Sequence, residues 1–298
     1  MGEGTVIESF SFFDSDLANT APRFFKKTVC DSPSPVGRER AGVRVGLINI
    51  LALLFFLASA LACFGQSQII ITNLAEQRKL GREFVQELLS LRPETNSSVS
   101  GVIKVRNSSS KQREIPVRFQ NLLTGTNWVS IFEKFPGSNA PGPNKLIIAH
   151  DTPQSNRYEL TLNVGGEPVR QWTKQKSEII LQLPFAGDFG TADLGLEFLH
   201  WPEQRMIKKE MARSQFCKVI ESINPQPATN AYSKVISWIQ HEGGGIVYAE
   251  AFDAKGAKLK EFRPKSLEKV HGQYQLREME MLNVQTGSRT RIEFDLEK

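Results

Sequence analysis

The chain has 298 residues, of which 40% are hydrophobic, 23% charged and 9% aromatic. This is the composition of a globular protein, and it excludes a disordered, collagen-like or multi-span membrane protein. The 37 Lys and Arg residues nearly balance 32 Asp and Glu residues, so the formal net charge of +5 does not indicate a nucleic-acid partner. Cys30, Cys63 and Cys217 are too widely spaced for a paired-cysteine metal site and too few for a disulfide framework. We therefore expect no metal and no cofactor.

A strongly apolar segment lies near the N-terminus. Residues Val45 to Phe64 include Asn49 and Ser59 as their only polar side chains, and arginines precede them at positions 38, 40 and 44. The small residues of Ala58-Ser59-Ala60 and Ala60-Leu61-Ala62 offer cleavage sites and favour a signal peptide over residues 43–65. The alternative is a retained membrane anchor, since twenty apolar residues just span a bilayer. In both cases the arginines keep to the cytoplasmic side and the following chain is exported.

Two further features of this end concern processing. Residues 1–42 show no clear hydrophobic periodicity, whereas a signal peptide normally begins near the initiator. We interpret them as a disordered upstream extension that is not part of the native protein, with translation starting at Val43. Cys63 closes the apolar run and is a candidate for lipidation. The preceding Ala60-Leu61-Ala62 matches a lipidation pattern poorly, because its large aliphatic residue stands at the wrong position.

The remaining residues, 66–298, are expected to form a single domain. A helix is predicted from Leu74 to Leu91, because Thr72 or Asn73 can cap it, apolar residues recur every three or four positions, and Pro93 stops it. The apolar period then falls to two, which indicates strands. These strands are expected at residues 98–106, 114–122, 128–135, 145–150, 158–164 and 168–172. Their connections are too short for crossover helices, so we expect antiparallel pairing.

The second half continues this pattern after one interruption. Residues 179–183 are strand-like, and Thr191 is expected to cap a short helix with Leu194, Phe198 and Leu199 on one face. Further extended segments are predicted at residues 213–223, 232–240, 246–252, 258–262, 274–282 and 290–296. The sequence therefore predicts a mainly β protein built as an antiparallel meander with few helices.

The sequence contains no nucleophile elbow, phosphate loop, dinucleotide fingerprint or HExxH helix, so we expect no enzymatic activity. His241-Glu242-Gly243-Gly244-Gly245 is similar to the oxyanion loop of lipases, but no Gly-x-Ser-x-Gly accompanies it, and we interpret it as a turn. Cys217 is expected to behave as a small buried hydrophobe. The basic residues from Lys255 to Lys265 are interpreted as a solvated hairpin, with contact to an anionic membrane surface as the alternative.

Several short motifs occur in an order that is similar to that of a known family. Asp188-Phe189-Gly190-Thr191-Ala192-Asp193-Leu194 precedes a strand through Cys217 that ends at Asn224-Pro225. Residues 232–239, YSKVISWI, are similar to a Tyr-x-Lys/Arg-Val-x-x-Trp-Ile segment, and residues 251–256, AFDAKG, to a Tyr/Phe-Asp-x-x-Gly hairpin. In an exported chain with a helix and a long meander, these motifs resemble the outer-membrane lipoprotein-sorting proteins of the LolA-like superfamily.

This resemblance implies a half-open, strongly curved antiparallel β-sheet or barrel with helices covering its mouth and an apolar cavity inside. It implies a periplasmic carrier or chaperone that binds the acyl chains of lipoproteins and sorts them to the outer membrane. The implied partners are an inner-membrane release complex and an outer-membrane acceptor, with transient membrane contact. The lipid-binding residues themselves are inferred from alternation, and they are Phe84, Leu88, Tyr158, Leu160, Leu162, Val164, Ile292 and Phe294. We expect these faces to converge on one interior.

Two other functions are kept open. One is a membrane-tethered lipoprotein acceptor or envelope-stress sensor of the same fold, which requires lipidation of Cys63 or retention of the apolar segment as an anchor. The other is an exported hydrolase with an unrecognised site, which two clustered carboxylates or a Ser/His pair in a cleft would favour.

Overall fold

The computed structural model describes residues 68–109, 111–125, 127–135, 143–150, 155–164, 167–173, 184–227, 231–270 and 273–296. The predictions for the upstream extension, the signal peptide or anchor, Cys63 and the strand at residues 179–183 lie outside these ranges. Within them, no helix combines the length and the apolar character needed to span a membrane.

The helix predicted after the export segment is confirmed as α2 (Leu74–Ser90). The side chain of Asn73 caps it, because Oδ1 accepts the backbone N–H groups of Ala75 and Glu76 at 2.9 and 3.1 Å. Its buried residues include Phe84 and Val85, which lie on the face that packs along the sheet.

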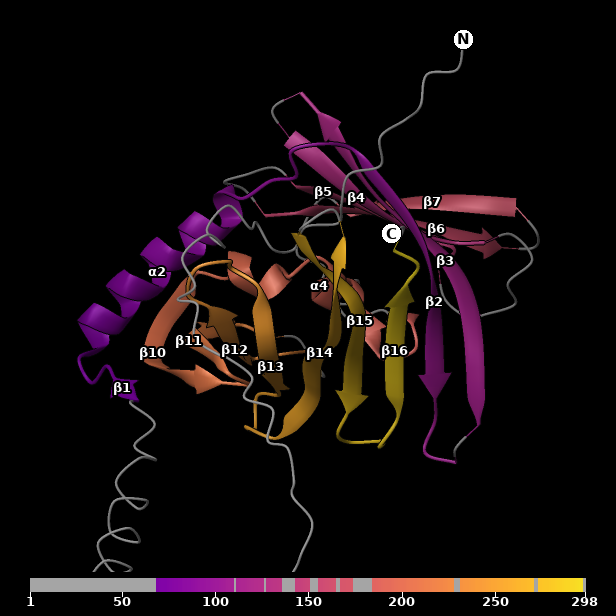
Figure 1. The fold of residues 1–298 in the computed structure, drawn as a ribbon. Coiled ribbons are helices and arrows are strands. Elements are labelled where there is room, and N and C mark those ends of the chain that lie inside the picture. The colour runs from indigo at the N-terminus through magenta and orange to yellow at the C-terminus, as the bar shows by residue number, and fades with distance from the viewer. Residues whose placement is uncertain are drawn as a thin grey trace, which may run out of the picture. The chain divides into compact units, whose positions relative to one another are not determined.

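Fourteen of the described strands form one antiparallel sheet (Figure 1), and the other two, residues 184–186 and 189–190, pair with each other. A first run comprises β1 (Ile69–Ile70), β2 (Ser97–Arg106), β3 (Gln112–Thr124), β4 (Asn127–Lys134), β5 (Lys145–His150), β6 (Arg157–Val164) and β7 (Glu167–Thr173). A second run comprises β10 (Glu203–Ala212), β11 (Gln215–Ile223), β12 (Lys234–Gln240), β13 (Ile246–Phe252), β14 (Lys258–Val270), β15 (Gln273–Asn283) and β16 (Arg289–Phe294). The last strand pairs with β2, which joins two sequential meanders into a single sheet.

This sheet does not close, because β1 and β7 are its two edges. The expected mainly β fold with a half-open antiparallel sheet is therefore confirmed. Strand β10 was not predicted. A β-bulge between Met206 and Lys208 shifts its register, so the alternation of apolar and polar residues breaks in mid-strand.

Between the two meanders lies a central segment, residues 184–200. It contains β8 (Pro184–Ala186), β9 (Phe189–Gly190), the short helix α4 (Thr191–Leu194) and the 3-10 helix η1 (Glu197–His200). The short helix was predicted here, but the prediction that Thr191 caps it is wrong. Gly190 occupies the cap position, and its backbone N–H donates to Asp193 Oδ2 at 2.8 Å.

The sheet curls around the central segment. Asp193 contacts Lys260 on β14 and Glu197 contacts Tyr158 on β6, although the two acidic residues are only four positions apart in sequence. Seven strand spacings separate β14 from β6 in the order of the sheet. The central segment therefore bridges strands of both meanders, and Figure 1 shows α4 on the inner side of the sheet.

Candidate functional site

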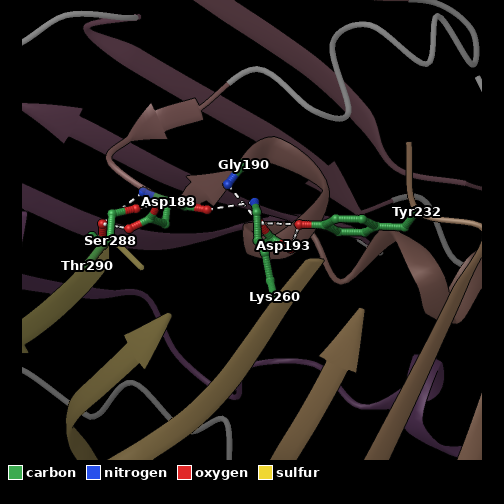
Figure 2. Close-up of polar contacts among 7 residues, drawn as sticks. All are labelled: Asp188, Gly190, Asp193, Tyr232, Lys260, Ser288 and Thr290. Carbon is green, nitrogen blue, oxygen red and sulfur yellow. Dashed lines mark hydrogen bonds and ion pairs between the residues drawn. The ribbon is translucent and has the colours of Figure 1, made fainter. Parts of the chain in front are cut away.

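Asp188 anchors the first part of the central segment to β16. Its carboxylate accepts two hydroxyl groups, from Ser288 at 2.6 Å and from Thr290 at 2.8 Å (Figure 2). The backbone N–H of Asp188 donates to the Thr290 hydroxyl oxygen at 2.8 Å. Both Asp188 and Thr290 are buried, so this group satisfies its polar atoms internally rather than with bulk water.

Asp193 anchors the segment to Lys260 on β14 and to Tyr232, which precedes β12. Its carboxylate accepts the Tyr232 hydroxyl at 2.9 Å and lies 3.0 Å from the Lys260 ammonium, as Figure 2 shows. The Lys260 ammonium also donates to the backbone oxygen of Asp188 at 2.6 Å. Burial, and then the negative charge of Asp193, raise the pKa of Tyr232 well above its usual range. The phenol therefore remains a hydrogen-bond donor throughout the physiological pH range.

A third anchor joins the end of the segment to β6. The Tyr158 hydroxyl donates to Glu197 Oε2 at 2.6 Å, and the Asn156 amide donates to the backbone oxygen of Gly195 at 2.7 Å. Gly195 permits this approach, since a Cβ there would lie 2.4 Å from the Tyr158 hydroxyl oxygen. Burial, and then Glu197, raise the pKa of Tyr158 well above its usual range.

Apart from Tyr158, which was predicted as a lipid-binding residue, these anchoring residues were not predicted as site residues. Residues 188–194 were identified only as part of a motif, because their partners lie up to about one hundred residues away in sequence. Register between distant strands determines such pairs, and a single sequence does not contain that information.

The inner face of the sheet around the central segment is apolar. One buried cluster gathers side chains from seven strands of the sheet, from β9 and from α4, including Phe119, whose ring packs edge-on against Phe132 and Phe294. Four of the predicted lipid-binding residues belong to this cluster: Tyr158, Leu160, Ile292 and Phe294. The alternation in β6 and β16 therefore indicated the inward faces of these two strands.

The remaining predicted residues are placed differently. Phe84 belongs to a second buried cluster between α2 and β10–β13, and Leu88 packs against that cluster. Leu162 is half-buried on β6, and Val164 ends that strand. The structure thus places four of the predicted residues in the first cluster and two at the second, rather than bringing the whole set to one interior. Phe262 on β14 packs against both clusters and lies at their junction.

The basic stretch from Lys255 to Lys265 is largely neutralised by ion pairs. Lys258 contacts Glu250 at 2.6 Å and Glu261 at 3.0 Å, and Arg263 contacts Glu261 at 2.8 Å. Lys260 is held by Asp193, as described above. Among the described residues this stretch therefore belongs to the sheet's own charge network, which weakens its interpretation as a membrane contact.

A Ser/His pair lies on the inner face of the sheet, on the neighbouring strands β4 and β5. Ser130 Oγ is 3.0 Å from His150 Nε2, and the imidazole stacks on Trp128 with ring centroids 3.7 Å apart. The Ser130 hydroxyl donates to Asn121 Oδ1 at 3.1 Å. Because the hydroxyl has a single proton, this arrangement leaves the imidazole nitrogen to donate to Ser130, which is the reverse of what nucleophile activation requires.

The other residues considered for chemistry in the sequence, Cys217 and the turn after β12, have structural roles. Cys217 is fully buried in β11, and burial raises the pKa of its thiol to about 11. Residues 241–243 form the predicted turn. Within the described part of the chain, no group of three or more His, Cys, Asp or Glu side chains is arranged to hold a metal ion.

Comparison with known proteins bears on the fold. A protein-family model described as "Uncharacterized protein" matches residues 181–296, and no curated protein matches the chain. A domain named as an outer membrane lipoprotein-sorting protein, from Vibrio parahaemolyticus, has a TM-score of 0.60 at 20% identity. A DUF1329 family protein from Desulfovibrio piger has a TM-score of 0.59 at 14% identity. A LolA superfamily protein from Nitrosomonas europaea has a TM-score of 0.50 at 16% identity. Each match covers 74% of this chain and 92% of the other.

The chain has the LolA-like fold. The resemblance first seen in three short motifs is thereby confirmed at the level of architecture. In this LolA-like fold the motifs meet in space, because Tyr232 of the second donates to Asp193 of the first. Asp253 of the third closes the β13–β14 turn by accepting the N–H groups of Lys255 and Ala257, both at 2.8 Å.

Proposed function

We propose that this protein is a periplasmic carrier that binds the acyl chains of lipoproteins on the apolar inner face of its curved sheet and sorts them to the outer membrane. The observation that carries the proposal is the fold shared with the Vibrio parahaemolyticus domain that is named as an outer membrane lipoprotein-sorting protein. The composition of the inner face supports it, since sixteen buried residues form the cluster around the central segment.

Energetics favour such a ligand. Each methylene removed from water contributes about 0.8 kcal/mol, so an apolar interior of sufficient size competes with a membrane for an acyl chain. The central segment lies on this face, where hydrogen bonds, one ion pair and the packing of Phe189 and Leu194 hold it. Its displacement would admit the chain, and its return would favour release to an acceptor.

The test is direct detection of cargo. The full chain is expressed in a bacterium with an outer membrane, and the exported product is purified without detergent and analysed by native mass spectrometry. We expect bound acyl lipid or lipoprotein in the wild type and its loss in Leu160→Asp. Because a charge at this buried position can unfold the sheet, Phe189→Ala provides a milder second variant, and circular dichroism monitors folding in both. A folded wild type without acyl cargo would contradict the proposal.

A tethered acceptor or envelope-stress sensor is the alternative within this fold. Fractionation of the same cells separates the two, since a cleaved carrier is expected in the periplasmic fraction and a tethered protein in the membrane fraction.

We further propose that the protein acts without catalysis. The hydrogen-bond direction at Ser130 supports this, and Ser130→Ala should leave acyl binding unchanged. Hydrolysis of p-nitrophenyl esters by the wild type, abolished in Ser130→Ala, would instead support the exported hydrolase.

A further inference from the structure

The tip of the β10–β11 hairpin carries two exposed apolar side chains. Met211 and Phe216 are cross-strand partners, and they are 40% and 37% exposed. Directly opposed residues of an antiparallel pair project on the same face of the sheet, so the two side chains form one continuous apolar surface.

A pair of lysines borders this apolar surface. Lys209 and Lys218 are also directly opposed, and they lie two residues from Met211 and Phe216 and hence on the same face. Like charges in this position repel each other. Among the described residues no carboxylate lies within ion-pair distance of either lysine, and Glu87 on α2 acts on Lys218 at longer range. The Lys218 ammonium instead lies 3.8 Å from the centroid of the Phe84 ring.

The turn that joins the two strands adds a third cation under backbone strain. Arg213 and Ser214 have φ values of 50° and 65°, a left-handed conformation that hairpin turns usually give to Gly or Asn. The Arg213 guanidinium donates to the backbone oxygen of Pro264 at 2.6 Å, which holds the turn against β14. Strained backbone that the surrounding structure maintains is concentrated at functional sites.

The neighbouring edge strand follows the apolar N-terminal segment closely in the sequence. Ile69 on β1 pairs with Lys209 and is 54% exposed. Ile69 lies five positions after Phe64, the end of the apolar segment, and five residues of chain reach at most about 18 Å. In the tethered alternative, a lipidated Cys63 or a retained anchor would keep this edge of the sheet beside the bilayer.

We propose that this docking face, formed by Ile69, Lys209, Met211, Arg213, Phe216 and Lys218, binds the surface of an anionic lipid bilayer. The apolar side chains enter the interface between headgroups and acyl chains, and the three cations meet lipid phosphates. This contact goes beyond the proposed carrier function and does not depend on cargo, because none of these residues belongs to the apolar cluster around the central segment.

Co-sedimentation with vesicles tests the proposal. The exported product of the full chain is mixed with vesicles of phosphatidylcholine alone or of phosphatidylcholine with phosphatidylglycerol. We expect binding to the anionic vesicles that weakens as salt is added. Lys209→Glu/Lys218→Glu should reduce it roughly 25-fold or more, at about fivefold for each lysine charge. Met211→Ser/Phe216→Ser should reduce it at every salt concentration.

Matched controls separate the docking face from overall charge and hydrophobicity. Lys111→Glu/Lys255→Glu changes the net charge equally at two exposed turns, and Leu123→Ser removes an exposed apolar side chain at the β3–β4 turn. Both should bind as the wild type does. Equal binding to neutral vesicles, or docking-face variants that bind like the wild type, would overturn the proposal.

Two additional measurements identify other outcomes. If the docking-face variants change the oligomeric state in analytical ultracentrifugation and leave vesicle binding unchanged, the face is an interface between copies of the chain and the proposal is wrong. Native mass spectrometry of the same variants follows cargo. Vesicle binding without any acyl cargo would overturn the carrier function and leave the docking face supported.

Discussion

The carboxylate of Asp193 receives a phenol, an ammonium and a backbone N–H, each from a different part of the chain. Asp193→Ala removes the partner of the Lys260 ammonium, whose side chain is 18% exposed. Loss of one member of such a buried pair leaves a charge uncompensated, so we expect the free energy of unfolding in urea to fall by about 3 kcal/mol.

A double-mutant cycle tests whether this loss of stability comes from the ion pair between Asp193 and Lys260. In Lys260→Met the ammonium is absent, and Asp193→Ala should then cost at least about 1 kcal/mol less than it does in the wild type. Additive effects of the two substitutions would mean that the ion pair does not hold the central segment.

His200 makes stability depend on pH. Burial lowers the pKa of His200 from its ordinary value of 6.5, so the unfolded chain binds the proton more readily than the folded chain. The stabilisation from the neutral imidazole is present above 6.5 and is lost as the pH falls through 6.5 toward the lowered folded value. We expect urea unfolding to show lower stability at about pH 5 than at about pH 7, and His200→Gln to reduce that difference.

His241 and Glu203 also contribute to the dependence of stability on pH. His241 also has a lowered pKa, caused by burial and then by Lys218 and Lys209, so His241→Gln should produce a further reduction. Hydrogen bonds from Arg205 and Arg78 hold the pKa of Glu203 below 4.5, and its contribution is lost only in more acidic solution. An unchanged slope in both histidine variants would contradict this assignment.

At the scale of elements, a glycine sets the distance between α2 and β10. A Cβ on Gly81 would lie 2.6 Å from the backbone oxygen of Gln204 and 2.7 Å from the backbone nitrogen of Arg205. Backbone cannot move aside as a flexible side chain does, so Gly81→Ala must push the helix away from the sheet. We expect thermal unfolding to show a loss of about 1–3 kcal/mol, despite the better helix propensity of Ala.

The neighbouring residue provides the matched control. Arg82 is exposed on the same helix, and Arg82→Ala should change stability by no more than about 0.5 kcal/mol. A Gly81→Ala variant as stable as this control would show that α2 does not need its close approach to β10.

Elements with an unbroken period could be predicted from the sequence. The α2 helix combines a capping asparagine with a regular apolar stripe, and turn-forming residues border β5 and β13 on both sides, so their predicted bounds agree with the structure within one residue. Strand β10 could not be predicted, because its bulge interrupts the alternation of apolar and polar residues. Strand β14 extends well beyond the predicted residues 258–262, because Pro264 and the charged residues after it lack the alternation on which the prediction depended.

At the scale of the whole molecule, the curl of the sheet follows from long-range pairing that no local pattern encodes. Alternation identified which side chains of β6 and β16 point inward, but the β16–β2 pairing and the three anchors of the central segment determine where they meet. For the same reason the face of α2 was expected in the common interior, whereas the structure gives it a separate cluster with β10–β13.

A volume-increasing substitution distinguishes an interior that takes up ligand from one that is simply packed. Leu162 is half-buried on β6 and projects on the same face as Leu160, beside the apolar cluster. If acyl chains occupy this side of the sheet, Leu162→Trp should displace them while costing less than about 1 kcal/mol, because the indole takes the place of ligand. In a packed interior the same change should cost about 1–3 kcal/mol and leave the bound lipid unchanged.

Leu123→Trp, at an exposed turn, controls for the indole itself. Native mass spectrometry and urea unfolding of the two variants measure both quantities, and a destabilised Leu162→Trp protein with undiminished cargo would place the acyl chains elsewhere.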